Sequence, residues 1–171
     1  LQKCSGYFAS KGIENPKFDA ETLLAHSLGC KRLELFLRFE DPLPEAKLAP
    51  FRELVKRRAK REPLQHILGF VDFFGLRLKC DARALVPRNE TEELCEIATE
   101  KLCPDRSAPL DILDLGTGSG AIALAMSSAY PNVSVDAAEL SDAAISLASE
   151  NAQSLGLKIN IIKSDWFENI G

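Results

Sequence analysis

The strongest constraint on the fold is the alternation of short apolar runs and helical segments between residues 111 and 163. The runs that predict strands are 111–115, 133–139 and 159–163, and the segments that predict helices are 121–129 and 142–155. A strand–helix–strand–helix–strand order is typical of a parallel sheet joined by right-handed crossover helices. The sequence therefore predicts an α/β fold for this half of the chain, with 111–115 as a buried strand.

The first 61 residues lack this alternation and predict a bundle of helices. Apolar residues recur at helical spacing from Phe18 to Leu28, and Gly29 ends the run. A second helix is expected over 32–39, before the Asp-Pro-Leu-Pro turn at 41–44, and a third over about 45–61. The third helix has an apolar stripe to bury, made of Leu48, Phe51, Leu54 and Val55.

Shorter apolar alternation over 64–86, broken by Gly69 and Gly75, predicts a hairpin or connector. Helical spacing returns over 90–102, and a turn-rich link follows at 104–109. The expected organisation is a helical domain at 1–62, a linking β-hairpin at 63–86 and an α/β domain at 87–171.

The charges are distributed unevenly along the chain. Residues 1–80 carry 15 Lys and Arg against 10 Asp and Glu, whereas residues 81–171 carry 6 against 15. Five cations crowd the segment 56–61. Two explanations stay open for them: a solvated helix end, which favours cations, or a basic surface for RNA or another phosphate-bearing partner.

Cysteine usage and the lack of long apolar runs indicate a cytoplasmic protein. The five cysteines include no Cys-x-x-Cys pair, which predicts free thiols and no metal site. Free thiols are typical of a reducing compartment. No apolar run approaches the roughly 20 residues that a membrane span needs, so no membrane partner is expected.

The glycine-rich segment Gly116-Thr117-Gly118-Ser119-Gly120 lies between a predicted strand and a predicted helix. Small residues there let the backbone approach a ligand, and the helix N-terminus offers unpaired N–H groups. A nucleotide-containing cofactor is therefore predicted. The spacing Gly116-x-Gly118-x-x-Ala121 also fits a dinucleotide site, so an NAD-dependent dehydrogenase stays open at this point.

The charges around this loop favour S-adenosylmethionine. No Lys or Arg occurs between Arg106 and Lys158, so a pyrophosphate would find no cation nearby in the sequence. Asp114 is expected at the carboxyl end of the first strand, facing the ligand. S-adenosylmethionine carries an ammonium and a sulfonium and has no phosphate, which suits such an acidic loop.

Three further residues are candidates for contacts with the adenosine part of this cofactor. Glu139 ends the second strand, where a carboxylate can accept hydrogen bonds from both ribose hydroxyls. Asp165 and Trp166 follow the third strand, where they could bind the adenine amino group and stack on the ring. The predicted cofactor-binding residues are Asp114, Gly116, Thr117, Gly118, Ser119, Gly120, Glu139, Asp165 and Trp166.

Together with motifs elsewhere in the chain, these residues resemble the release-factor glutamine methyltransferases. The motifs are Asp19-Ala20-Glu21-x-Leu23-Leu24, the segment 62–69 (Glu-Pro-Leu-Gln-His-Ile-Leu-Gly), Phe73-x-Gly75-Leu76 and the segment 86–92 (Val-Pro-Arg-Asn-Glu-Thr-Glu). Asn89 stands where that family usually has proline, and Glu139 where aspartate is usual. The resemblance implies a Rossmann-like class I S-adenosylmethionine-dependent methyltransferase sheet behind a helical substrate-recognition domain. It also implies methyl transfer to a glutamine side-chain nitrogen of class I peptide release factors.

In that family a catalytic Asn-Pro-Pro-Tyr loop follows a fourth strand, and this sequence reaches Gly171 before such a strand. The resemblance therefore implies a fragment with a truncated sheet, in which no catalytic residue can be named. Without the fourth strand, 112–115 would be an exposed edge, which predicts that the fragment self-associates.

Two other functions stay open from the sequence. A nucleic-acid amino-group methyltransferase could use the same loop chemistry, with the basic segment 56–61 following RNA. Alternatively, the chain as it stands could bind a partner without catalysing a reaction. Methyl transfer to a release factor rather than to RNA would separate these possibilities.

Overall fold

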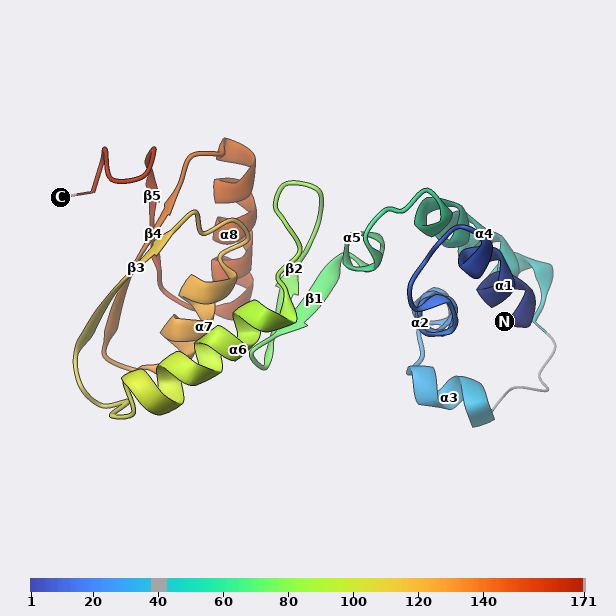
Figure 1. Ribbon diagram of the computed structural model, residues 1–171, viewed down its shortest axis with the longest axis horizontal. Coiled ribbons are helices and arrows are strands. Elements are labelled where there is room, and N and C mark those ends of the chain that lie inside the picture. Colours follow the sequence, from blue (N-terminus) through green and yellow to red (C-terminus); the bar gives the residue numbers. More distant parts are fainter. Residues whose placement is uncertain (38–42, 171) are drawn as a thin grey trace. The chain divides into compact units, whose positions relative to one another are not determined.

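The computed structural model describes residues 1–37 and 43–170, the side chain of residue 102 excepted. The chain forms two compact units, Leu1–Leu68 and Gly69–Gly171. Helices alone make up the described part of the first unit, whereas the second contains all the described strands (Figure 1).

The first unit confirms the predicted helical region. Its helices are α1 (Gln2–Ser10), α2 (Pro16–Leu28), α3 (Arg32–Leu37), α4 (Glu45–Ala59) and α5 (Leu64–Leu68). The helix predicted over 32–39 is confirmed as far as Leu37, while residues 38–42, with the start of the predicted Asp-Pro turn, lie outside the described residues. The helix α5 was not expected, because five residues are too few to show helical periodicity.

The core of the first unit forms where the apolar sides of these helices meet. Phe8 of α1, Leu23 of α2 and Phe51 of α4 are buried in one cluster with Ile67 of α5. The remaining members of the predicted stripe of α4 pack against that cluster. An ion pair also joins α2 to α4, because Arg58 Nε donates to Asp19 Oδ2 at 2.7 Å.

The second unit contains a two-stranded hairpin and a three-stranded parallel sheet. Its elements are β1 (Phe70–Phe73), β2 (Leu76–Lys79), α6 (Asn89–Ile97), a π-helical turn (Ala98–Leu102), β3 (Leu110–Leu115), α7 (Ala121–Ala129), β4 (Val133–Glu139), α8 (Asp142–Leu155) and β5 (Asn160–Lys163). The parallel strands lie in the order β3-β4-β5, with Leu115 opposite Ala138 and Glu139 opposite Lys163. The predicted α/β fold is confirmed.

The strand β3 differs from the buried strand that its apolar sequence predicts. Both α7 and α8 pack on the same side of the sheet (Figure 1). Ile112 therefore packs against the helices, whereas Leu113 points to the other face and is 40% exposed. Among the described strands, β3 pairs only with β4 and forms an edge of the sheet. Self-association through this edge stays a prediction.

The predicted hairpin is confirmed, but it is part of the second unit rather than a link between two domains. Its strands pair antiparallel, with Phe70 opposite Lys79. Phe73 and Leu78 are buried in the same cluster as Leu124 of α7. The boundary therefore falls after Leu68 rather than after residue 62, because α5 packs into the helical core and the hairpin packs against α7 and α8.

Candidate cofactor-binding site

The site begins where β3 ends and the glycine-rich loop turns into α7. The N–H groups of Gly116 and Thr117 both donate to the carbonyl of Ala138 in β4, at 2.9 and 3.0 Å. Gly118 has φ of +57°, a left-handed conformation that favours glycine. A side chain there would also stand at the cavity that this loop lines.

Asp114 is the buried carboxylate at the start of this loop. Its Oδ2 accepts hydrogen bonds from Thr117 Oγ1 at 2.7 Å and from the Ala123 N–H at 3.2 Å. Burial raises the pKa of Asp114 above its usual value, and these two hydrogen bonds oppose the rise. Within the described part of the chain, Asp114 forms no ion pair with Lys or Arg, so its negative charge suits a cationic ligand.

Glu139 lies at the end of β4, on the next strand of the sheet. Its Oε2 accepts from the Gly118 N–H at 2.9 Å, and Oε1 accepts from the N–H groups of Leu140 and Ser141, both at 2.9 Å. The carboxylate therefore holds the glycine-rich loop against the start of α8. Each oxygen has two lone pairs, so Oε2 retains one with which to accept a ligand hydroxyl.

The structure brings most of the predicted residues around one cavity of about 470 Å³. Those that line it are Asp114, Gly116, Thr117, Gly118, Ser119 and Glu139. Their contact with a cofactor stays a prediction. The cavity has a volume that could hold a ligand, and the carboxylates of Asp114 and Glu139 lie in its lining.

Gly120 lies outside that lining, and the structure gives a packing reason for glycine at this position. Its φ is +83°, and a Cβ there would lie 3.2 Å from Leu124 Cδ1 and 3.3 Å from Ala148 Cβ. Gly120 therefore allows α7 and α8 to approach each other, whereas the sequence places it among the cofactor contacts.

Asp165 and Trp166 also lie outside the cavity lining. They follow β5 in a tight turn, in which Ser164 Oγ donates to the Trp166 carbonyl at 2.9 Å and accepts from the Asn169 N–H at 3.0 Å. Trp166 is 70% exposed and has φ of +49°. The predicted stacking and adenine contacts of these two residues remain untested predictions.

Asn151 supports the glycine-rich loop, and the sequence reasoning missed it. This fully buried residue of α8 accepts from the Lys79 N–H at 2.7 Å and donates to the carbonyls of Lys79 and Ser119 at 3.2 and 2.9 Å. It therefore ties the hairpin to the loop. The available signal was its place on the buried stripe of α8, with Leu147 and Ala148 at helical spacing.

Two cations also line the cavity, although the sequence suggests none nearby. Arg83 and Arg88 come from the segment between the hairpin and α6. Arg83 is held by Asp81 and by Glu150, the second at 2.6 and 2.9 Å. The expectation that a pyrophosphate would find no cation nearby therefore holds along the sequence but not in space, because the fold brings in two arginines that lie more than 25 positions before the loop.

The segment 86–92 forms the start of α6 and one wall of the cavity. Asn89 is the first residue of the helix, a position at which proline fits well because its N–H is not needed. Glu92 Oε1 accepts from the Phe74 N–H at 2.7 Å, which fixes the start of α6 to the hairpin turn.

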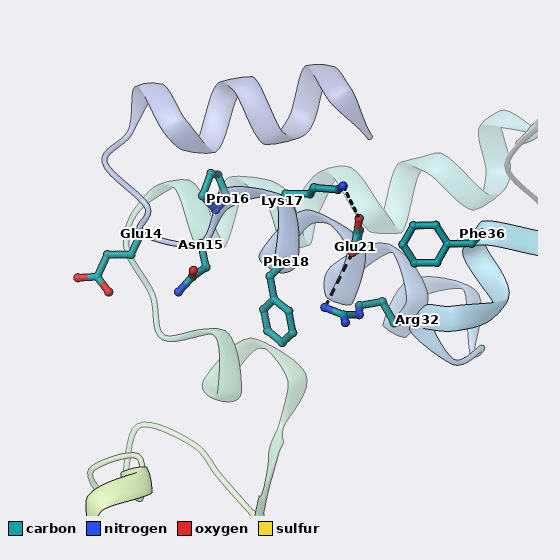
Figure 2. Close-up of a pocket in the computed structure, with 8 residues that line it drawn as sticks. All are labelled: Glu14, Asn15, Pro16, Lys17, Phe18, Glu21, Arg32 and Phe36. Carbon is teal, nitrogen blue, oxygen red and sulfur yellow. Dashed lines mark ion pairs between the residues drawn. The ribbon is translucent and has the colours of Figure 1, made fainter.

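The first unit has a hollow of its own, of about 400 Å³, lined by residues of α2, α3 and the turn before α2. Figure 2 shows Glu21 between Lys17 and Arg32, which lie 4.0 and 3.9 Å from its carboxylate oxygens. Arg32 also lies over the Phe18 ring, 4.7 Å from its centroid, and Phe36 borders the hollow. Lys17, Glu21 and Arg32 are paired with one another, and the aromatic rings of Phe18 and Phe36 lie beside them for contact with a partner.

The basic segment 56–61 is mostly engaged within the first unit. Arg57 donates to Glu62 at 2.9 Å, Arg58 to Asp19, and Arg61 to the carbonyls of Lys11 and Gly12 at 3.4 and 3.2 Å. Lys56 donates to Glu53 at 2.6 Å, so four of the five cations have partners within the first unit, which favours the structural explanation over an RNA surface.

The cysteines are free thiols, as the sequence predicts. Burial raises the pKa of Cys80 and of Cys95 to about 11, so both are protonated at neutral pH. Within the described ranges no group of three or more His, Cys, Asp or Glu is placed to hold a metal ion. The described helices include none with the length and apolarity to cross a membrane.

Comparison with known proteins gives matches to both units. Residues 1–69 match the PrmC N-terminal domain and residues 95–171 the methyltransferase small domain. The first match ends at the boundary between the two units.

Curated relatives match almost the whole chain. The release factor glutamine methyltransferase of Rhodopirellula baltica is 38% identical over 99% of this chain and 59% of its own length. Those of Geobacter sulfurreducens and Deinococcus radiodurans are both 42% identical, over 97% and 95% of this chain and 57% and 58% of their own lengths. The chain thus spans less than two thirds of these relatives. The similarity runs through both units in one order, so the chain is similar to the release factor glutamine methyltransferases along almost its whole length.

Proposed function

We propose that the protein transfers a methyl group from S-adenosylmethionine to a glutamine side-chain nitrogen of a class I peptide release factor. The observation that carries the proposal is the similarity to release factor glutamine methyltransferases across both units. The cavity at the glycine-rich loop supports it, because its buried carboxylate, Asp114, forms no ion pair among the described residues, which suits a cationic cofactor.

The residues around the cavity fit the cofactor by the chemistry of their side chains. Asp114 would attract its positive charges, and Glu139 would accept from a hydroxyl of its ribose. Gly116 and Gly118 let the backbone come close to it. When bound, the cofactor supplies an electrophilic methyl group on a sulfonium. The residues of this chain would bind and orient it, and none of them is assigned a catalytic step.

The first unit is proposed to contact the release factor. Large apolar side chains on α2 and α3 face solvent there, with Phe18 48% and Leu37 84% exposed. Clustered exposed apolar groups are typical of surfaces that bind another protein. The proposed place of action is the cytoplasm, which the five free cysteines support.

Transfer of a radioactive methyl group by the full-length protein tests the proposal. We expect label in a release factor and none in a variant whose acceptor glutamine is replaced by asparagine, because the shorter side chain misplaces the nitrogen. Label in RNA but not in the release factor would favour the nucleic-acid methyltransferase instead. Binding of a release factor without any transfer would favour a non-catalytic module.

A further inference from the structure

Glu21 of α2 is a buried carboxylate in the first unit whose capacity to accept hydrogen bonds is unused. The residue is only 5% exposed. Its nearest cations, Lys17 Nζ and Arg32 Nη1, lie 4.0 and 3.9 Å from its two oxygens. Both distances exceed the roughly 2.7–3.2 Å of a hydrogen bond, and this carboxylate accepts none from the described residues. A buried carboxylate without hydrogen bonds costs the folded state free energy, which a donor from a bound partner can offset.

This carboxylate can be reached from outside the protein, although little of its own surface is exposed. It lines the hollow of about 400 Å³ drawn in Figure 2, with the Phe18 and Phe36 rings to either side of it. A second hollow, of about 530 Å³, also has Glu21 and Phe36 in its lining, together with the apolar side chains of Ala20 and Leu35. The site therefore combines a carboxylate with aromatic and apolar walls.

One side of the site already shows which group this combination suits. The guanidinium of Arg32 lies over the Phe18 ring and faces the Glu21 carboxylate. Arginine fits such a pair because its planar group stacks on a ring while it donates two parallel hydrogen bonds to a carboxylate. Phe36 offers a second ring that is 52% exposed, and no cation of the described residues lies over it. A second guanidinium would find there a ring and a carboxylate that can still accept.

Lys17 is the group that such a guanidinium would displace. Its side chain is 80% exposed, and it faces Glu21 one helical turn along α2. Exposed pairs of this kind contribute little to stability, so the lysine can move into solvent at small cost. Without it, the lining of the hollow contains the carboxylates of Glu14 and Glu21 against the single cation Arg32. The charge of the hollow then favours a cationic partner.

We propose that this hollow binds an arginine side chain of the release factor, whose guanidinium donates to Glu21 and stacks on Phe36. The inference rests on the proposed function, because it names a contact within the surface through which the first unit is proposed to bind that substrate. It makes Glu21 a residue that determines specificity, in addition to the exposed apolar groups around it.

Steady-state methyl transfer to the release factor by the full-length protein tests the assignment. In Glu21→Gln the KM for the release factor should rise about 10- to 100-fold, the usual worth of hydrogen bonds to a charged group. The kcat should stay within about twofold, because Glu21 lies in the unit that lacks the cofactor cavity. Phe36→Leu should raise KM about 2- to 10-fold by loss of the stacking face. Lys17→Gln should lower KM about twofold because it removes the competing cation, an effect that a merely structural Glu21 would not produce.

The arginine itself is found by combining Glu21→Gln with arginine-to-glutamine variants of the release factor. One of these should raise KM with the unaltered protein and have no further effect with Glu21→Gln. The matched control is Glu53→Gln, which changes an exposed carboxylate of the same unit outside both hollows and should leave KM unchanged. Thermal unfolding shows whether each variant stays folded.

The outcomes separate this inference from the proposed function. Normal methyl transfer with an unchanged KM in Glu21→Gln, or with no arginine of the release factor coupled to Glu21, would overturn the assignment and leave the proposed function intact. Absence of transfer to the release factor by the unaltered protein would overturn the proposed function as well.

Discussion

Among the described residues, each unit contains one buried aspartate, and the two differ in their hydrogen-bond partners. Asp19 in α2 is 4% exposed and receives a hydrogen bond from a cation, Arg58 Nε. Asp114 at the end of β3 is 8% exposed and receives hydrogen bonds only from neutral groups, Thr117 and the Ala123 N–H. Within the described residues, the protein itself balances the first charge and leaves the second for a ligand.

The difference shows how a buried charge can distinguish a structural role from a binding role. A buried carboxylate that has a cation partner stabilises the fold as a pair, and removing either partner is costly. A buried carboxylate without one costs the folded state free energy, which a cationic ligand can offset. The four predictions below test this comparison, from the largest expected effect to the smallest.

The largest effect is expected from Arg58→Met, which leaves Asp19 charged and buried without its partner. The free energy of unfolding of the first unit should fall by about 3–5 kcal/mol. Hydrogen exchange of the α2 and α4 amides measures this loss within the first unit. The control is Arg52→Met, which breaks an exposed pair with Glu45 and should cost less than about 1 kcal/mol. Equal costs for the two variants would show that burial of Asp19 does not matter.

In the second unit, the neutral side chain of Asn151 joins the hairpin to the glycine-rich loop. Asn151→Ala would leave the N–H and carbonyl of Lys79 and the carbonyl of Ser119 without their partner. The unfolding free energy of this unit should fall by about 2–4 kcal/mol, and the hairpin amides should exchange faster. Gln153→Ala, an exposed change on the same helix, should have almost no effect. Unchanged hairpin exchange in Asn151→Ala would contradict the placement of the hairpin within this unit.

The comparison itself is tested by the matched pair Asp114→Asn and Asp19→Asn. Because burial raises the pKa of Asp114, its charged form disfavours folding, and this cost disappears as the pH falls through the raised pKa. Asp114→Asn should therefore leave stability at neutral pH unchanged or slightly higher. It should weaken S-adenosylmethionine binding about 10- to 30-fold, by loss of a charge in the cavity.

Asp19→Asn should do the reverse, because it leaves Arg58 without an anion. We expect lower stability of the first unit and unchanged cofactor affinity. Denaturant unfolding measures the stability of each variant, and calorimetry measures the affinity of each for S-adenosylmethionine. A large loss of stability in Asp114→Asn would mean that this carboxylate also has a structural role.

The smallest effect concerns the surface link between Glu150 and the segment before α6. Hydrogen bonds from Arg83 and then Lys79 lower the pKa of Glu150 from its usual 4.5 to about 2. The contribution of this link is fully present above pH 4.5 and is lost as the pH falls through about 2. Carbon-13 NMR of the Glu150 carboxyl should follow this titration. Arg83→Gln should raise the pKa more than Lys79→Gln, and the opposite order would contradict the assignment.

Local patterns predicted much of the second unit well. The predicted ranges 121–129, 133–139 and 142–155 agree with α7, β4 and α8 at both ends. These elements are long, with regular apolar spacing and clear ends, such as the Ser141 hydroxyl that accepts from the Ala144 N–H. The short helix α5 has no such pattern and was not expected, whereas the π-helical turn after α6 falls within the helical range predicted over 90–102.

The candidate site was predicted only in part. Residues within or next to the glycine-rich loop were found because the chain itself places them there. Arg83, Arg88 and Asn151 were missed, because each comes to the site through packing of an element distant in the sequence. Gly120 was assigned to the ligand because a sequence motif does not show which glycine faces a cavity and which faces a neighbouring helix.

The sequence by itself determined the order of helices and strands in the α/β region, the turn of the glycine-rich loop and the family to which the chain is similar. These follow from periodicity and backbone conformation, which act over a few residues. Only the tertiary structure decided which charged side chains of the described residues have a partner within the protein and which have none. Opposite charges attract according to their distance in space and their burial, so a run such as 56–61 can be engaged in the fold while Arg88 remains available beside a cavity.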